Sequence, residues 1–213
     1  MDEEISIKLI LLGNSGTGKT NIINSFINKP FDDNACSTIT SAFATKSVII
    51  NQKNYNVDIW DTAGQEAYRS LTKIFINDSN IVIFVYDITN KNSFTDLEYW
   101  INLTKEILDD STFYVILGNK YDLYLNEQVE EEEARKKAEE IGAYFKLSSA
   151  KCERKNLNKI FDEIVEKYVN KMKIKNNNND EKDDNLKEEE KIFDLNKNNK
   201  NGNTNKKKCC YLV

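Results

Sequence analysis

The sequence has no histidine among its 213 residues and only four cysteines, which are Cys36, Cys152, Cys209 and Cys210. The spacing of these cysteines matches no zinc-binding pattern, and no histidine is present to complete a zinc site. Histidine is also the commonest general base in enzymes. Any catalysis by this chain must therefore depend on charge and on the positioning of reacting groups.

Long apolar runs and an excess of positive charge are missing as well. The longest apolar run, Ile81–Tyr86, is far too short to cross a bilayer. Lysine and arginine number 30 against 35 aspartates and glutamates, so the formal net charge is −5 and no nucleic-acid partner is expected. The first four residues are acidic in character, unlike a secretory signal. We expect a cytoplasmic protein.

The most informative stretch is Gly13–Thr20, which has the sequence GNSGTGKT and fits the phosphate-binding pattern G-x-x-x-x-G-K-[ST]. The run Ile5–Leu12 predicts a buried strand before it, and helical spacing of apolar residues predicts a helix after it. This context disfavours the alternative, a glycine-rich turn that matches by chance. Glycines with positive φ let backbone N–H groups converge on phosphate oxygens. The predicted phosphate-binding residues here are Ser15, Gly16, Thr17, Gly18, Lys19 and Thr20.

Strand-like runs alternate with helical patterns along most of the chain. The predicted strands are Ile5–Leu12, Ser47–Ile50, Tyr55–Trp60, Ile81–Asp87, Phe113–Gly118 and Ala143–Leu147, and the predicted helices lie near 19–28, 91–109, 130–141 and 156–172. The alternation predicts an α/β fold, with a six-stranded, mostly parallel sheet and helices on both faces. The short polar turn Asn51–Asn54 requires one antiparallel strand. Ligands of such sheets bind at the carboxyl ends of the strands.

A second motif, Trp60–Glu66 (WDTAGQE), lies at the end of a predicted strand. The Asp61 carboxylate can hold Mg²⁺ through water, as the Thr20 hydroxyl can directly. The backbone N–H of Gly64 can reach a terminal phosphate, and the Gln65 amide can orient an attacking water. Alone the motif is a polar turn; after a phosphate-binding loop it predicts phosphate chemistry.

Two further motifs, Asn119–Asp122 (NKYD) and Ser148–Lys151 (SSAK), also follow predicted strands. The Asp122 carboxylate can accept hydrogen bonds from N1–H and N2–H₂ of guanine. Adenine lacks both donors and would leave the carboxylate unpaired, which discriminates strongly between the two bases. Backbone N–H groups of the second motif can face the base. Each motif alone is an ordinary loop sequence, and only their order after a phosphate-binding loop gives them weight.

Together these motifs resemble the small GTPases of the Ras superfamily, and most closely the Rab branch, over about residues 5–170. Rab-like segments are Trp60–Glu66, Tyr68–Leu71, Tyr86–Asn90 with Ser93 and Phe94, and Gly118–Lys120. The resemblance implies a P-loop NTPase G domain over residues 1–172 that binds GTP and GDP with Mg²⁺ and hydrolyses GTP to GDP and phosphate. Since no arginine lies between Phe31 and Phe43, turnover without a GTPase-activating protein should be slow.

The resemblance also implies a role for particular residues. Gln65 is the implied catalytic residue, and Thr38 and Gly64 are implied to contact the γ-phosphate. The implied metal ligands are Thr20, Thr38 and Asp61. The implied guanine-binding residues are Phe31, Asn119, Lys120, Asp122, Ser149, Ala150 and Lys151. An effector surface maps to Phe43, Trp60 and Phe75, for which packing in the core is the alternative.

Residues 173–213 have too few apolar side chains to build a core, so we predict a flexible Asn- and Lys-rich tail. Its end, Lys206–Val213 (KKKCCYLV), resembles the doubly geranylgeranylated ends of Rabs and predicts lipidation of Cys209 and Cys210. Disulfide pairing is the alternative, and a reducing cytosol disfavours it. The resemblance then implies anchoring to the cytosolic face of endomembranes, such as Golgi or endosome. Implied partners are a GTPase-activating protein, an exchange factor, a prenylation escort protein, a GDP-dissociation inhibitor and effectors.

Two other functions stay open at this point. The chain would be a nucleotide-locked interaction protein if it bound GTP or GDP and scarcely hydrolysed it. Gln65 argues against that function, whereas Thr40 and Ala42, which depart from the usual Rab residues, keep it open. An ATP-using kinase with a phosphate-binding loop is disfavoured by Asp122, whose carboxylate suits guanine.

Overall fold

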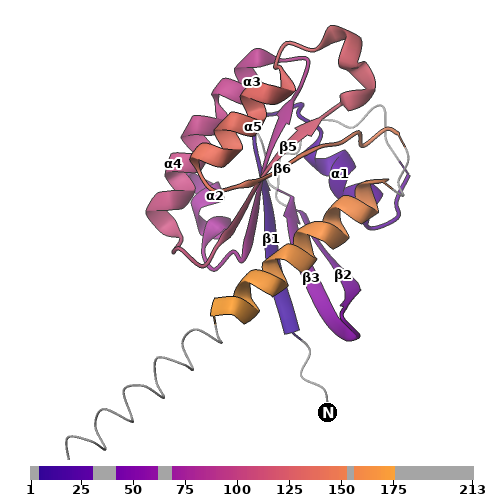
Figure 1. Ribbon diagram of the computed structural model, residues 1–213, viewed down its shortest axis with the longest axis vertical. Coiled ribbons are helices and arrows are strands. Elements are labelled where there is room, and N and C mark those ends of the chain that lie inside the picture. Colours follow the sequence, from indigo (N-terminus) through magenta and orange to yellow (C-terminus); the bar gives the residue numbers. More distant parts are fainter. Residues whose placement is uncertain (1–4, 31–41, 62–68, 153–155, 176–213) are drawn as a thin grey trace, which may run out of the picture. The chain divides into compact units, whose positions relative to one another are not determined.

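The structure is a computed structural model that describes residues 5–30, 42–61, 69–152 and 156–175 (Figure 1). The chain divides into two units, Met1–Tyr168 and Val169–Val213. In the second unit the described residues, 169–175, are helical. No helix of the described residues is both long and apolar enough to cross a membrane.

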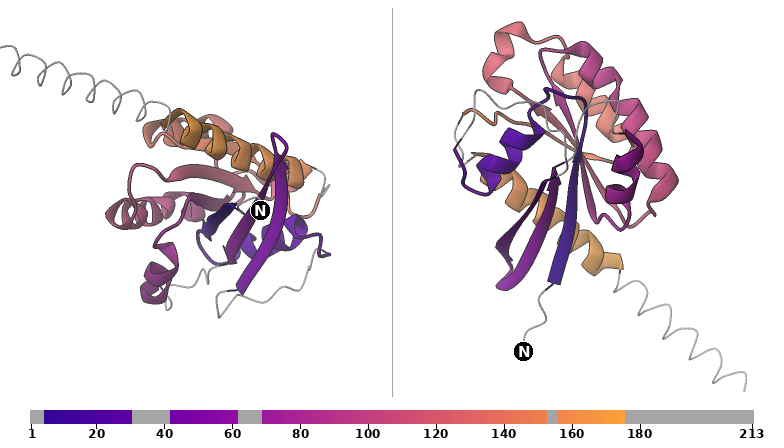
Figure 2. Two further views of the ribbon diagram at one scale, coloured as in Figure 1. Left: turned by 90° about the horizontal axis from the view of Figure 1, so that it is seen from below. Right: turned by 180° about the vertical axis from the view of Figure 1, so that it is seen from behind.

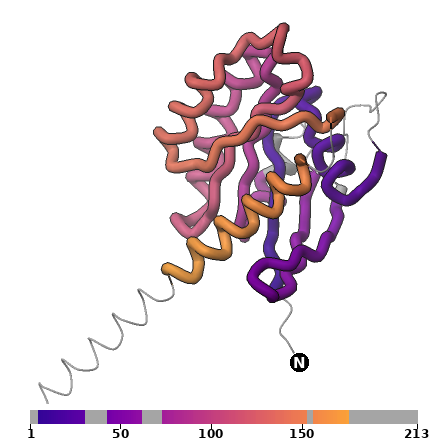
Figure 3. The backbone as a smooth tube through the Cα atoms, turned by 45° about the vertical axis from the view of Figure 1, so that its right-hand side comes forward, coloured from indigo at the N-terminus to yellow at the C-terminus, as the bar shows by residue number. Residues whose placement is uncertain are grey.

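The first unit is built on a six-stranded sheet with the strand order β2-β3-β1-β4-β5-β6. The central strand β1 lies between β3 and β4 and runs parallel to both (Figure 3). Only the edge strand β2 is antiparallel, because a tight turn joins it to β3, as the sequence predicts. The strands are β1 (Ile5–Leu12), β2 (Ala42–Ile50), β3 (Lys53–Asp61), β4 (Ile81–Asp87), β5 (Phe113–Asn119) and β6 (Tyr144–Leu147).

Helices lie on both faces of this sheet (Figure 2), so the predicted α/β architecture is confirmed. On one face, Phe26 of α1 stacks on Phe161, with ring centroids 4.2 Å apart. Residues 156–168 of this unit are helical. The other face is covered by α2, α4 and α5. The helices are α1 (Lys19–Phe26), α2 (Arg69–Ile76), α3 (Lys91–Thr95), α4 (Leu97–Ile107), α5 (Glu131–Glu140) and the 3₁₀ segment η2 (Tyr121–Asn126).

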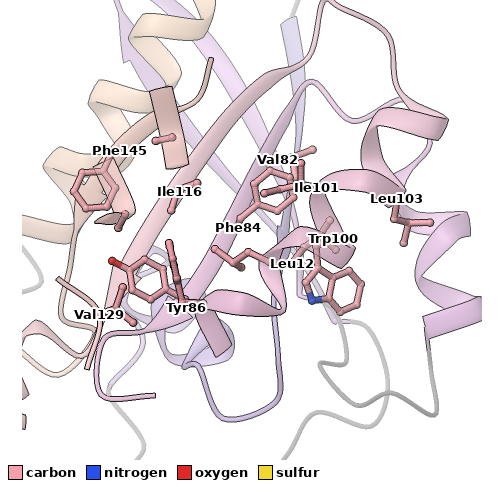
Figure 4. Close-up of a cluster of buried hydrophobic side chains, with 14 of the residues drawn as sticks. Leu12, Val82, Phe84, Tyr86, Trp100, Ile101, Leu103, Ile116, Val129 and Phe145 are labelled. Carbon is pink, nitrogen blue, oxygen red and sulfur yellow. The ribbon is translucent and has the colours of Figure 1, made fainter. Parts of the chain in front are cut away.

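A cluster of large buried side chains joins the second face to its helices (Figure 4). Phe84 and Tyr86 project from β4, and Trp100 packs on this face from α4. All three are almost fully buried, and β4 is buried along its whole length. A strand covered on both faces has a continuous apolar sequence rather than an alternating one. This core fixes the carboxyl ends of the central strands, where the predicted motifs lie.

Besides the 3₁₀ segment η2, which no predicted helix includes, three elements differ clearly from the sequence prediction. The helix predicted near 91–109 is two helices, because the chain tightens into a 3₁₀ turn at Asp96, whose carbonyl accepts from Tyr99 N at 3.2 Å. Helix α2 was not predicted, since three of its eight residues are β-branched and favour strands. Strand β2 begins at Ala42 rather than Ser47, because polar residues in its first half interrupt the apolar pattern.

Candidate functional site

The phosphate-binding motif forms a tight loop between β1 and α1. Gly13, Gly16 and Gly18 have φ angles of 146°, 78° and 94°, so the positive φ predicted for these glycines is confirmed. A Cβ atom at Gly13 would lie 2.1 Å from the carbonyl oxygen of Val85, and one at Gly18 would lie 2.3 Å from Asn119 Nδ2. Both positions therefore require glycine for two reasons, the backbone angle and the close approach of a neighbour.

The Lys19 ammonium lies inside this loop. Its Nζ atom donates to the carbonyl oxygens of Gly13 at 2.7 Å and Asn14 at 2.9 Å. Burial lowers the pKa of Lys19 to about 8, and the nearby Asp61 carboxylate offsets part of that shift. A buried ammonium gains from an approaching anion, and a phosphate group is the anion that such a loop suits.

Thr20 and Asp61 meet at the carboxyl ends of two paired strands. The Thr20 hydroxyl donates to Asp61 Oδ2 at 2.7 Å, and Asp61 is only 2% exposed. Asp61 stands opposite Leu11 in the parallel pairing of β1 and β3, which brings its carboxylate beside the phosphate-binding loop. Hydroxyl and carboxylate oxygens are hard ligands of the kind that Mg²⁺ prefers. No group of three or more acidic, Cys or His side chains that could hold a metal occurs among the described residues.

Asn119 connects three segments of the site. Its Nδ2 donates to the carbonyl oxygen of Thr17 at 2.8 Å, in the phosphate-binding loop. Its Oδ1 accepts from the backbone N–H of Ala150 at 3.2 Å and from Ser148 Oγ at 3.4 Å. The side chain is buried, with 1% of Asn119 exposed. Asn119 therefore holds the two predicted base-binding motifs and the phosphate-binding loop together.

The Asp122 carboxylate, at the end of the first base-binding motif, contacts the second motif. Its Oδ1 accepts from Ser149 Oγ at 2.5 Å, and the same hydroxyl oxygen accepts from Cys152 N at 3.0 Å. Asp122 is half-buried and Lys151 is exposed. Ser149 thus orients Asp122 through its hydroxyl, a contact that the sequence did not specify. The structure brings all of the described guanine-binding candidates into one corner: Asn119, Lys120, Asp122, Ser149, Ala150 and Lys151.

Asp87 is a member of the site that sequence reasoning missed. Its Oδ2 atom lies 2.6 Å from Lys120 Nζ, and its Oδ1 accepts from the backbone N–H of Thr89 at 2.9 Å and its hydroxyl at 2.7 Å. Asp87 faces Asn119 across the pairing of β4 and β5. The available sequence signal was Asp87 itself, a carboxylate at the end of an otherwise apolar strand. The neighbouring strand β5 ends at Asn119, and Lys120 follows it.

We expect Asp87→Asn to speed GDP release about threefold to tenfold, because Lys120 loses a charged hydrogen-bond partner while Thr89 keeps an acceptor. Release of a fluorescent GDP analogue measures the change. Asp58→Asn is the matched control, since Asp58 accepts from Ser6 and Thr45 elsewhere on the sheet. In a Lys120→Met background the Asp87 substitution should add little. An equal effect in both backgrounds would show that Asp87 does not act through Lys120.

Three aromatic side chains predicted to form an effector surface lie in a row across β2, β3 and α2. The ring centroids of Phe43 and Trp60 are 5.1 Å apart, and those of Trp60 and Phe75 are 5.3 Å apart. Trp60 and Phe75 pack partly against the core, whereas Phe43 is 57% exposed. Two rings of the row thus pack in part against the core, and the third is exposed at the surface.

Several predicted residues lie outside the described residues: Phe31, Thr38, Gly64, Gln65, Cys209 and Cys210. Within the described part, a second contact that the sequence did not reveal fixes the phosphate-binding loop. Asn14 Nδ2 donates to Asp96 Oδ2 at 2.6 Å, which connects the loop to the start of α4. The two residues are 82 positions apart, so no local pattern could indicate their contact.

Comparison with known proteins decides the family. A family model described as the Ras family matches residues 8–170. The Ras-related protein Rab-2B of Dictyostelium discoideum is 36% identical over 165 residues, which cover 78% of this chain and 81% of the relative. The chain is a Rab-type small GTPase of the Ras family. As a GTPase of this family, it hydrolyses GTP to GDP and phosphate.

Other Rab proteins match over a similar span. Ras-related protein Rab5A of Oryza sativa subsp. japonica is 38% identical over 160 residues, which cover 75% of this chain and 78% of the relative. Ras-related protein Rab-21 of Homo sapiens is 35% identical over 164 residues, which cover 77% and 72%. The six-stranded sheet with one antiparallel strand is the G domain of this small GTPase.

Proposed function

We propose that this Rab-type GTPase is a membrane-anchored switch in vesicle trafficking that recognises guanine through Asp122. The observation that carries the proposal is the connection made by Asn119, which joins the phosphate-binding loop to the loop of Asp122. One site thereby contains a loop of glycines with positive φ angles, a buried ammonium and a carboxylate. This combination suits a nucleotide with several phosphates and a base that offers two adjacent donors.

The phosphates would bind at the loop of Gly13–Thr20. Backbone N–H groups of the loop and the start of α1 face an anion there, and Lys19 would exchange its carbonyl contacts for phosphate oxygens. Thr20 and Asp61 would hold Mg²⁺, directly and through water, together with Thr38. When bound, the ion neutralises phosphate charge. The donor set fits, because Mg²⁺ is usually held by one or two carboxylates, hydroxyl groups and the phosphates themselves.

Removal of Mg²⁺ with EDTA should accelerate GDP release by about tenfold or more, because the phosphates lose their shared cation. Thr20→Ala should release GDP quickly both with and without EDTA, since its hydroxyl ligand is gone. Thr95→Ala is a matched control, because Thr95 is an exposed residue of α3 whose hydroxyl bonds only to its own helix among the described contacts. If EDTA does not change the rate of GDP release from the unmodified protein, the proposed Mg²⁺ ligands are contradicted.

Hydrolysis would depend on Gln65, whose amide can orient the attacking water. No arginine lies in residues 32–42, so no cation of that segment stabilises the transition state, and turnover without a GTPase-activating protein should stay below about 10⁻² s⁻¹. Single-turnover hydrolysis of GTP measures this rate. Gln65→Leu should abolish the measurable reaction and leave GTP bound. If the substitution changes nothing, the alternative of a nucleotide-locked interaction protein is favoured.

The relatives named Rab support a role at membranes, and the end of the chain fits that role. Cys209 and Cys210 would carry lipids, and Lys206–Lys208 would add attraction to an anionic leaflet, at roughly 1 kcal/mol each. Two lipids or a lipid with basic residues give stable anchoring. Mass spectrometry of the protein from its own cells tests this, because lipidated cysteines have a shifted mass. Unmodified cysteines in protein from the membrane fraction would overturn the proposal of a lipid anchor.

Partners would recognise the nucleotide state of the protein. A GTPase-activating protein, an exchange factor, an escort protein, a GDP-dissociation inhibitor and effectors are the partners that such a cycle requires. The row of Phe43, Trp60 and Phe75 would be the effector surface, because its exposed ring continues into rings fixed by the core.

A further inference from the structure

Exposed apolar side chains gather in one short segment of the G domain, which begins within the predicted base-binding motif Asn119–Asp122. Of the ten large hydrophobic side chains that are exposed among the described residues, four lie within five consecutive positions. They belong to η2, and their exposed fractions run from 43% to 84%. We call this group the η2 patch; its members are Tyr121, Leu123, Tyr124 and Leu125.

Backbone hydrogen bonds connect the η2 patch to neighbouring segments at its start and just beyond its end. The N–H of Tyr121 donates to the carbonyl oxygen of Ser148 at 3.0 Å, and the N–H of Gln128 donates to that of Ile88 at 2.8 Å. The rings of Tyr121 and Tyr124 lie side by side, with centroids 6.3 Å apart. Isolated exposed hydrophobic residues are ordinary, but a fixed group of them marks an interaction site.

Carboxylates follow this patch along the chain, from the end of η2 to the first turn of α5. Exposed Glu127, Glu130 and Glu132 form no ion pair within the described part of the chain. Two further glutamates of the same run do, with Lys91 and with Arg135. These glutamates therefore favour a cationic partner and disfavour an anionic lipid surface.

From the exposed patch and the glutamates that follow it between η2 and the first turn of α5, we propose that the η2 patch docks a cationic amphipathic segment of a partner protein. Leucine, isoleucine or phenylalanine side chains of that segment would cover Tyr124 and Leu125, and its lysines or arginines would face Glu130 and Glu132. The surface is separate from the row of Phe43, Trp60 and Phe75, because η2 follows β5 and the row begins on the edge strand β2. The proposal does not depend on how the protein recognises guanine or on its lipid anchor.

The test uses the full-length protein and a synthetic helical peptide of leucine and lysine, with a peptide of leucine and glutamate as its counterpart. Fluorescence anisotropy measures affinity, and amide shifts of the isotope-labelled protein locate the binding site. We expect the lysine peptide to bind with shifts confined to about residues 121–132. The double variant Tyr124→Ser, Leu125→Ser should bind it at least about tenfold more weakly. Glu130→Gln with Glu132→Gln should weaken it about threefold and reduce its salt dependence.

Ile49→Ser is the matched control, since Ile49 is 72% exposed on β2, and it should bind the peptide as the unmodified protein does. All variants change exposed side chains and should keep GDP binding, which separates failure of this inference from failure of the proposed function. Equal binding by the patch variants, equal binding of the glutamate peptide, or shifts on another surface would overturn the proposal. Self-association that Leu125→Ser abolishes would instead assign the patch to a second copy of the chain and overturn it too.

Discussion

Asp122→Asn should lower the affinity for GDP by roughly 10³-fold or more and create affinity for xanthine nucleotides. The asparagine amide donates where the carboxylate accepts, so it faces the N2 amine of guanine donor to donor. Xanthine has a carbonyl oxygen at that position and would pair with the amide instead. The Ser149 hydroxyl, now bonded to Asp122 at 2.5 Å, can still donate to the amide oxygen, so the loop should keep its shape.

Competition of GDP and xanthosine diphosphate against a fluorescent GDP analogue measures both changes. Asp110→Asn provides the control, because Asp110 is exposed before the start of β5, whereas Asp122 follows the end of that strand. The control should keep the guanine preference of the unmodified protein. An Asp122→Asn protein that still prefers guanine would show that another group reads the base.

Asn119→Ala should lower the free energy of unfolding by about 3 kcal/mol and the melting temperature by about 10 °C. The substitution leaves the carbonyl oxygen of Thr17 and the N–H of Ala150 without the partner that Asn119 gives them. The same change frees the phosphate-binding loop from the base-binding loops, so GDP release should accelerate by roughly a hundredfold. Thermal unfolding and release of a fluorescent GDP analogue measure the two effects.

Asn102→Ala tests whether these effects belong to the site. Asn102 is exposed on α4 and donates to Glu98 at 3.4 Å, so its loss should change the melting temperature by little. If the two variants lose similar amounts of stability, the contacts of Asn119 contribute no more to stability than an exposed surface contact does. Lower stability of Asn119→Ala with unchanged GDP release would remove its proposed role in joining the loops.

The parts of the fold that could be predicted are those whose pattern is local. Strands β1 and β4 have the predicted bounds because their apolar runs are buried and end sharply in glycine or aspartate. The phosphate-binding loop was predictable because its motif is contiguous in the sequence and its glycines have positive φ angles, whereas the neighbours that crowd Gly13 and Gly18 come from distant strands. The break between α3 and α4 at Asp96 was not, since it depends on a turn inside an otherwise helical pattern.

The parts of the site that could not be predicted are pairings between distant segments. Asp87 and Lys120 meet because β4 and β5 pair in a particular register, and Asn14 meets Asp96 because α4 packs beside the loop. The sequence indicated which residues carry the chemistry but gave no sign of which neighbours orient them. Ser149 illustrates the difference: the sequence predicts it at the base, and the structure adds that its hydroxyl donates to Asp122.

In the proposed function, a single site binds the phosphates through the loop of Gly13–Thr20 and identifies guanine through Asp122. Competition of GDP against ADP for the purified, unmodified protein tests it most directly. GDP should displace a bound fluorescent GDP analogue at concentrations at least about 10³-fold lower than ADP does. Equal displacement by the two nucleotides would contradict it.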